Sequence, residues 1–273
     1  MARFRICVII IASVVLTLTC GDVTMAEAAD DLYRAQTIVT GQGEVNRLVG
    51  FAICLEDVLI KVSGDLKLAG DPRLAPYKSN AKEFVTAHDY RDQKAGKPKG
   101  DEQGTRDRSF YLTVDFDKDR IDGLLKKLGL MPWLANRPTV TVLIAMDQGA
   151  KGYVITSDAA QTLAPRDALL AAAARRGMNI MVPDEAALAK AGISAATFAK
   201  LPPAASAAGQ GGDVTLVGRL AWDDRALGWA TEWQMVWQGR HRWRFRSVTF
   251  DDAFRRALGG AAQILSGNGE PGR

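Results

Sequence analysis

Alternating apolar and polar residues are densest between residues 213 and 249, where they predict three consecutive β-strands. Three sets of alternate residues would share one buried face: Val214, Leu216, Gly218, Leu220 and Trp222; Trp229, Thr231, Trp233, Met235 and Trp237; His241, Trp243 and Phe245. A three-residue loop over residues 239–241 would pair Trp237 with Trp243 and Met235 with Phe245, because this register keeps the apolar faces together. Thr249 then begins a final helix, whose apolar residues would cover the tryptophan face.

The N-terminal half carries a second set of regular patterns. They predict a strand at 32–39, a helix at 44–63, a short helix between 71 and 84, strands at 84–90 and 109–116, and a helix ending at residue 128. The helix at 44–63 is the clearest, because its apolar residues recur every three or four positions and Gly64 stands where a C-cap glycine belongs. Asp117 is expected to cap the helix that ends this half. The predicted order is β-α-α-β-β-α.

The C-terminal half opens on a strongly apolar run. Residues 139–146 (T-V-T-V-L-I-A-M) predict an interior strand, since both faces would be buried. A helix at 166–176, a short strand at 179–182 and a helix beginning at Pro183-Asp184 follow. The alanine-rich residues 186–212 are interpreted as short surface helices and a loop.

These elements predict an α/β protein of the α+β kind with two small mixed subdomains. The C-terminal subdomain would hold a mixed sheet that ends in an antiparallel three-strand meander and a helix. The expected organisation is a signal peptide (1–28), an N-terminal subdomain (29–131), a linker (132–138), a C-terminal subdomain (139–266) and a tail (267–273).

The first 28 residues have the pattern of a secretory signal. Arg3 and Arg5 precede an apolar run over residues 6–16, and Ala26-Glu27-Ala28 supplies a small-x-small cleavage site. The run is shorter than the roughly 20 apolar residues that span a bilayer. We therefore expect cleavage after Ala28 and a periplasmic location.

The three cysteines bear on the same question. Cys20 is a rival processing site, since lipoprotein signals end at a cysteine, but Thr17 and Thr19 fit a lipobox poorly. Cleavage after Ala28 would remove Cys7 and Cys20 and leave Cys54 unable to form an internal disulfide. Cys54 lies in an apolar helical pattern, which is typical of a small buried hydrophobic residue.

Composition narrows the class of partner. The chain is 47% hydrophobic and 24% charged, as in ordinary globular proteins. Its net charge of +4 over 273 residues is only mildly basic. In an exported protein, such a small positive charge gives no reason to expect a nucleic-acid partner. No second membrane segment follows the signal, so no stable transmembrane segment is expected after processing.

Candidate chemistry is sparse. His88 and His241 are the only histidines, one in each half. Asp115, Asp117 and Asp119 resemble the start of a calcium loop, but Arg120 replaces the required glycine, so a strand end followed by a helix cap explains them better. The glycines of residues 209–212 lack the lysine of a phosphate loop, and no zinc-type spacing is present. We predict no catalytic residue, metal site or cofactor.

One pattern points to binding. The arginines that alternate with the apolar residues of the last strand are Arg240, Arg242, Arg244 and Arg246. Four guanidinium groups on one strand face could bind phosphate or carboxylate in a bidentate manner. The sequence by itself favours the simpler interpretation, a solvated sheet face that discourages edge pairing and is partly neutralised by Glu232 and nearby acids. Alternation places Trp243 on the opposite face, which argues against stacking with a nucleic acid or a sugar.

Several segments resemble a known family. They are V-L-I-K-V-S-G-D (58–65), R-P-T-V-T-V-L-I-A-M-D (137–147), A-A-A-A-R-R-G-M-N-I-M-V-P-D (171–184) and L-V-G-R-L (216–220), with Gly228-Trp229 and Trp233. The combination resembles the Gram-negative envelope proteins grouped as domain of unknown function 2066. The resemblance implies an exported α/β protein, and it carries no activity, substrate or site residue.

Two functions follow as expectations. The first is a non-catalytic periplasmic protein that binds a partner protein or an anionic envelope component. The alternative is a periplasmic hydrolase with an Asp/Ser/His site that no motif reveals. A cleft bringing together Asp115, His88 or the region of Asp158 would favour the enzyme.

Overall fold

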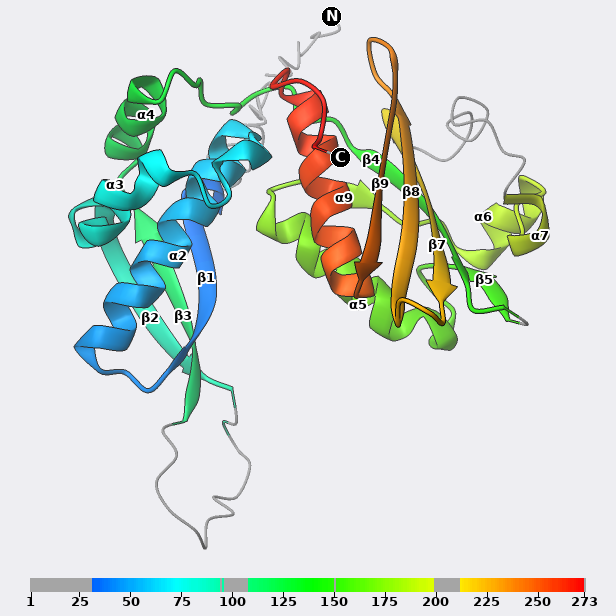
Figure 1. Cartoon of the computed structure of the whole chain (residues 1–273), viewed down its shortest axis with the longest axis horizontal. Coiled ribbons are helices and arrows are strands. Elements are labelled where there is room, and N and C mark those ends of the chain that lie inside the picture. Colours follow the sequence, from blue (N-terminus) through cyan, green and yellow to red (C-terminus); the bar gives the residue numbers. More distant parts are fainter. Residues whose placement is uncertain (1–30, 94, 96–107, 150, 199–211, 273) are drawn as a thin grey trace, which may run out of the picture.

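The computed structural model describes residues 31–93, 95, 108–149, 151–198 and 212–272. The expected signal peptide, the alternative processing site Cys20 and the glycines at positions 209 and 211 lie outside the described residues. The described chain is an α+β fold with one antiparallel three-stranded sheet and one mixed sheet (Figure 1). This is the predicted fold class.

The N-terminal unit is a three-stranded sheet covered on one face by a long helix. Its strands β1 (Arg34–Thr40), β3 (Ser109–Phe116) and β2 (Val85–Asp92) lie in the order β1-β3-β2, all antiparallel. Helix α2 (Glu44–Ser63) packs on this sheet, and the short α3 (Ala75–Ser79) and α4 (Lys118–Lys127) complete the core (Figure 1). The predicted helix cap is confirmed, since the Asp117 carboxylate accepts the N–H of Arg120.

Helix α2 has the predicted bounds. Gly64 ends it in the left-handed conformation (φ 75°), and its N–H donates to the Ile60 carbonyl. Residues 57–63 are buried on every side, because the last turns of the helix lie between the N-terminal sheet and the C-terminal unit. The single short helix expected after it is instead α3 flanked by 3₁₀ helices at Leu66–Leu68, Pro72–Leu74 and Ala81–Phe84.

The C-terminal unit is a mixed sheet. Its order is β5-β4-β7-β8-β9, and β6 pairs with β4. The strands are β4 (Val140–Asp147), β5 (Gly152–Val154), β6 (Ile180–Met181), β7 (Val214–Asp223), β8 (Gly228–Val236) and β9 (Arg240–Val248). Strand β4 runs parallel to β6 and β7, and it is interior as predicted, since residues 140–146 are all buried.

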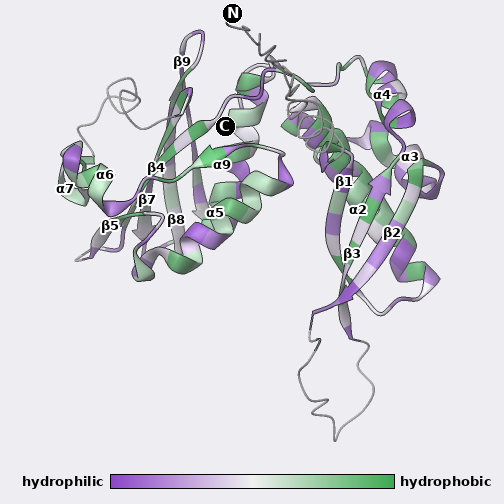
Figure 2. Ribbon diagram, turned by 180° about the vertical axis from the view of Figure 1, so that it is seen from behind, coloured by the Kyte–Doolittle hydropathy of each residue, from purple (hydrophilic) through white to green (hydrophobic). Residues whose placement is uncertain are grey.

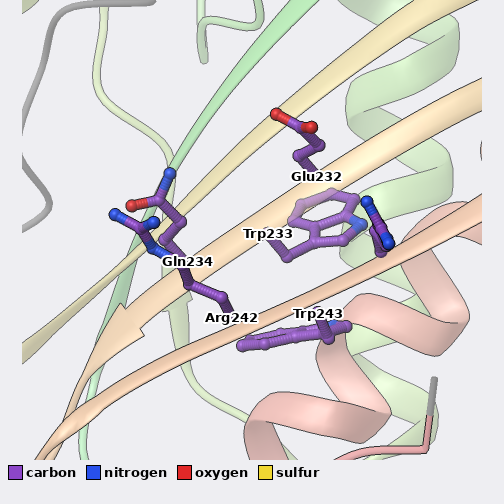
Figure 3. A pocket seen from close by; sticks show the side chains of 6 residues that line it. Glu232, Trp233, Gln234, Arg242 and Trp243 are labelled. Atoms are coloured by element: carbon purple, nitrogen blue, oxygen red, sulfur yellow. The ribbon is translucent and has the colours of Figure 1, made fainter.

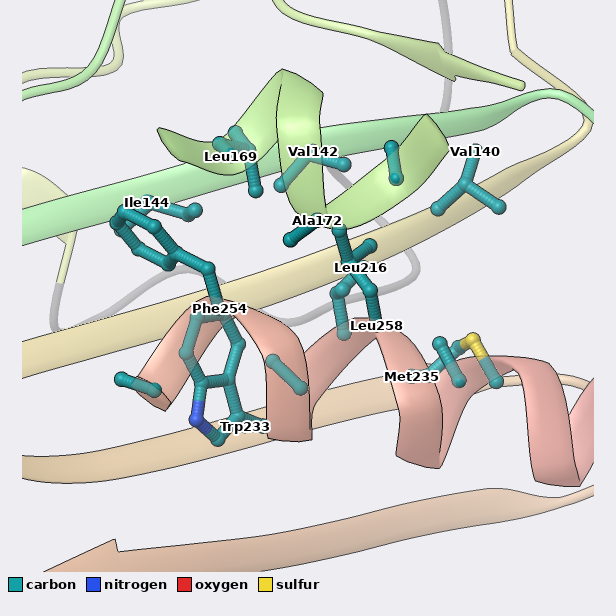
Figure 4. Close-up of a cluster of buried hydrophobic side chains, with 14 of the residues drawn as sticks. Val140, Val142, Ile144, Leu169, Ala172, Leu216, Trp233, Met235, Phe254 and Leu258 are labelled. Atoms are coloured by element: carbon teal, nitrogen blue, oxygen red, sulfur yellow. The ribbon is translucent and has the colours of Figure 1, made fainter. Parts of the chain in front are cut away.

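Helices cover this sheet unequally. Helices α5 (Leu163–Arg175) and α9 (Phe250–Leu265) pack on one face, where Phe254 and Leu258 meet Leu216, Trp233 and their neighbours (Figure 4). The short α6 (Glu185–Lys190) and α7 (Ala195–Phe198) cover only the β4 and β7 part of the other face. On the remaining β8 and β9 part of that face, no described element covers the side chains, which are exposed or half-buried.

The strand faces of the meander were predicted correctly apart from Trp222, which is 39% exposed at the end of β7, but the register was not. Trp233, not Trp237, lies opposite Trp243, and Met235 lies opposite His241, not Phe245. Trp237 falls in the turn before Gly239, where Gln238 adopts a positive φ of 51°. The observed register differs from the predicted one by four residues. Because an even shift keeps every side chain on its face, the alternation did not specify which even register forms.

Gly218 shows why a glycine interrupts the apolar face of β7. It lies directly opposite Trp233 on β8. A Cβ at Gly218 would stand 2.1 Å from Cζ3 of that indole ring, so only a glycine leaves space for it. Trp233 is 1% exposed, and its ring meets Phe254 edge to face with 6.4 Å between centroids.

Candidate functional site

The four arginines that the sequence singled out lie on one strand at the edge of the C-terminal sheet. Arg240, Arg242, Arg244 and Arg246 are all exposed, and they alternate with His241, Trp243 and Phe245 on the core side of β9. Hydrophilic residues accordingly mark β9 in Figure 2. Alternation along a strand is what brings the four guanidinium groups to one surface.

Neighbouring strands contribute few negative charges to this surface. Arg242 lies opposite Gln234, and Arg244 lies opposite Glu232 on β8. Arg219 on β7 pairs with the Asp147 carboxylate at 3.2 Å. Among the described residues, none of the four β9 arginines forms an ion pair. We call these arginines, with Arg219, Glu232 and Gln234, the arginine face.

The arginine face is hollowed in three places. A hollow of about 380 Å³ is lined by Arg242 and Arg244 with Glu232 and Gln234, and the adjoining Trp233 and Trp243 complete it (Figure 3). A second, of about 150 Å³, lies between Arg219, Arg244 and Arg246. A third, of about 440 Å³, lies between Arg240, Arg242 and the chain end at Glu270 and Pro271. In Figure 3, Arg242 and Gln234 reach toward each other across the two strands.

This geometry suits anion binding. A guanidinium group is planar, stays charged, and donates two parallel hydrogen bonds to a carboxylate or phosphate. Successive arginines on one strand face are about 7 Å apart along the strand, so one extended anionic molecule could reach several of them. Glu232 lies opposite Arg244, and Glu270 lines a hollow with Arg240 and Arg242, but neither forms an ion pair with a β9 arginine among the described residues, so the guanidinium groups can still donate to a ligand.

The two histidines are not brought together. His241 belongs to the core side of β9, where Nδ1 lies 2.7 Å from Glu270 Oε1 and Nε2 lies 2.8 Å from the Trp237 carbonyl. His88 lies on β2 in the other unit, with its ring edge to face against Phe51 at 5.3 Å between centroids. Both rings therefore have structural contacts that account for them.

The acidic residues considered for a hydrolase are also separate. Asp115 forms an ion pair with Arg34, and His88 points toward α2 on the opposite face of the N-terminal sheet. Asp158 lies in the C-terminal unit, where its carboxylate accepts the N–H of Glu185. The described structure does not assemble these groups into one cleft.

Cys54 is the buried hydrophobic residue that its pattern predicted. It is 0% exposed in the core of the N-terminal unit. Burial raises the pKa of its thiol to about 12, and the nearby Asp57 carboxylate adds to this. The thiolate that a nucleophile requires is therefore strongly disfavoured.

A charged cluster between the two units was missed by sequence reasoning. Asp57 of α2 accepts two hydrogen bonds from Arg175, at 3.0 and 2.6 Å, and lies 3.4 Å from Arg176. Lys61, one turn later, donates to the carbonyls of Asp31 and Arg34, and burial lowers its pKa. The available signal was an Asp and a Lys separated by three apolar residues, 58–60, on the strongly apolar half of the helix.

Arg137 joins the same interface from the connecting segment. Its guanidinium group donates to the carbonyls of Lys61, Arg176 and Gly177 and lies 4.0 Å from the centre of the Trp133 ring. Further along, Asn268 donates to the Ser63 carbonyl. Most of these charges and donors contact groups within the protein, so the interface cluster holds the units together, although Arg176 Nε has no hydrogen-bond partner among the described residues and a hollow of about 410 Å³ is lined by Asp57, Lys61 and Arg175.

Comparison with known proteins adds one match. Residues 26–134 match a family model described as a domain of unknown function (DUF8605). No curated protein and no solved structure shows significant similarity to the chain. The matched residues cover the N-terminal unit and leave out β9, so the family match does not bear on the arginine face.

Proposed function

We propose that this is an exported, non-catalytic periplasmic protein that binds an anionic envelope component or an acidic partner protein through its arginine face. One observation carries the proposal: four exposed guanidinium groups lie on one strand face without ion-pair partners among the described residues. Exposed guanidinium groups about 7 Å apart along one strand attract counter-charges, and one bound anion could contact several of them at once.

The location rests on the sequence. Residues 1–28 combine a basic start, an apolar run and a small-x-small site, and the resemblance to the envelope family of domain of unknown function 2066 agrees with export. Within the described residues, no helix is both long and apolar enough to cross a membrane. We further propose that residues 29–131 and 139–266 form two subdomains joined by residues 132–138.

Binding can be tested with a charge-matched pair of variants. The first replaces Arg242, Arg244 and Arg246 by glutamine. The control removes the same charge from exposed residues elsewhere, as Lys126→Gln, Lys127→Gln and Arg225→Gln. Both should keep the parent's thermal stability.

Each protein would be titrated with polyphosphate, phosphatidylglycerol vesicles and peptidoglycan fragments, and crosslinked in intact cells with mass identification of partners. We expect one of these anions, or one crosslinked partner, to bind the parent and the control but not the arginine variant. Binding should weaken with salt, because exposed charges are screened beyond about 8 Å at physiological ionic strength. Equal binding by parent and arginine variant in every assay would refute the proposal.

A further inference from the structure

Strand β9 is the last strand of its sheet. In the described part of the chain β9 (Arg240–Val248) pairs with β8 alone, in a continuous register from Arg240 to Phe245 and with a register shift before Val248. An edge strand of this length presents a row of unpaired backbone N–H and C=O groups on its outer side.

The arginines are the residues whose backbone faces that outer side. The Phe245 N–H donates to Thr231 Oγ1 on β8 at 3.2 Å, so the backbone of Phe245 points inward to the sheet. Backbone direction alternates along a strand together with the side chains. The N–H and C=O groups of Arg242 and Arg244 therefore point outward, while their side chains lie on the open face.

Space is available beside this edge. The hollow of about 440 Å³ is lined by Arg240 and Arg242 on one side and by Glu270 and Pro271 on the other. The chain end reaches β9 from the core side, where Glu270 meets His241. The hollow lies between arginine side chains of the open face and a segment that contacts the core side of β9, and no residue of β8 lines it, which places it beside the outer edge of the strand.

The positive charge of the arginines determines which kind of segment can pair with the edge of β9. A second copy of β9 added to this edge would bring a second row of arginines against the first, and like charges on neighbouring strands are destabilising. An extended segment with alternate acidic residues would instead place carboxylates beside Arg242 and Arg244. Its other residues would face the half-buried Phe245.

We propose that β9 binds an extended acidic segment of a partner protein by β-strand addition. Main-chain hydrogen bonds to the edge would supply affinity, and the arginines would select the acidic sequence. The proposal rests on the anion binding proposed above and names the kind of partner that uses it.

Backbone-methylated peptides separate strand addition from simple anion binding. The probe is a ten-residue peptide of alternating glutamate and valine, made unmodified, N-methylated at the glutamates, or N-methylated at the valines. All three carry the same charge, but in an added strand only one set of N–H groups faces β9. We expect the two methylated peptides to differ at least about tenfold in affinity, since one set breaks several hydrogen bonds. If the two methylated peptides bind with equal affinity, strand addition is wrong, whether that affinity matches the unmodified peptide or is lost in both.

A variant pair tests the same contact from the protein side. Arg244→Gln removes the charge and keeps the backbone N–H, whereas Arg244→Pro removes both and leaves the ladder to β8 intact, because that N–H points outward. We expect the unmodified peptide to bind Arg244→Pro at least about tenfold more weakly than Arg244→Gln. Equal binding by two folded variants counts against strand addition, and the peptide comparison decides if the proline variant fails to fold.

Failure of each proposal has its own signature. If polyphosphate and the unmodified peptide bind the parent but not the triple glutamine variant, while the two methylated peptides bind alike, anion binding stands and strand addition falls. If no probe separates the parent from the triple glutamine variant, both fall. A dimer of the parent that the Arg244→Pro change dissociates, seen by size exclusion, would also overturn the choice of an acidic partner over a second copy.

Discussion

Replacing Gly218 by alanine, with and without Trp233, tests the packing of the C-terminal core. The added Cβ would stand 2.1, 2.5 and 2.8 Å from three carbons of the Trp233 ring. These atoms are not the far end of a flexible chain, since the ring is 1% exposed, meets Phe254, and donates from Nε1 to Thr231 Oγ1 at 3.0 Å. Neither the ring nor the strand can move without disturbing other contacts.

The expected magnitudes follow from these contacts. Gly218→Ala should lower the free energy of unfolding by about 3 kcal/mol, at the upper end of typical overpacking effects. Trp233→Ala should lower it by roughly 3–5 kcal/mol, through lost burial and the cavity left behind. In the double variant the new methyl group lies in that cavity, so the clash is absent. Alanine also restricts the unfolded chain more than glycine, which favours folding by about 0.4–1 kcal/mol.

The double variant should therefore be as stable as Trp233→Ala or slightly more stable. This corresponds to a coupling of about 3 kcal/mol between two residues on neighbouring strands, well above the roughly 0.5 kcal/mol scatter of independent sites. Urea unfolding followed by circular dichroism would measure all four proteins. Gln234→Ala, on the open face next to Trp233, is the control and should change stability by less than about 1 kcal/mol. Additive losses for Gly218 and Trp233 would refute the derived contact.

Three further predictions use other parts of the molecule. Asp57→Asn should destabilise the protein by about 3 kcal/mol, because Arg176, which is 7% exposed, would lose its carboxylate partner. Loss of an exposed ion pair costs less than about 1 kcal/mol. A change that small in the free energy of urea unfolding would contradict a buried ion pair between Asp57 and Arg176. Because burial raises the pKa of Cys54 from 9.0 to about 12, the native thiol should stay protonated and unlabelled by iodoacetamide at pH 9, while the unfolded thiol is labelled at once; equal labelling rates would show an accessible thiolate. Intact mass of the exported protein should begin at Ala29 without lipid, and a diacylglyceryl group on Cys20 would overturn the processing prediction.

Local signals account for what could be predicted of this fold. Helix α2 was placed to the residue because a glycine in the left-handed conformation ends it, and this requirement can be seen in the sequence itself. The caps at Asp117 and Thr249 act over three residues, and they were also correct. The exposed arginines followed from strand alternation, which depends only on neighbouring residues in the chain.

Nonlocal contacts decided the rest. The four-residue error in the β8–β9 register arose because both registers keep the same faces, and the observed register goes with a turn at residues 237–239 in which Gln238 adopts a positive φ. The Asp57 cluster unites residues 118 apart along the chain, so no local pattern could assign Arg175 as its partner. The sequence by itself determined the main helices and strands and which arginines share a strand face, but not the burial of Asp57 and Lys61. Only the tertiary structure decided that β9 lies at an edge with an open side, since strand order depends on which distant strands pair.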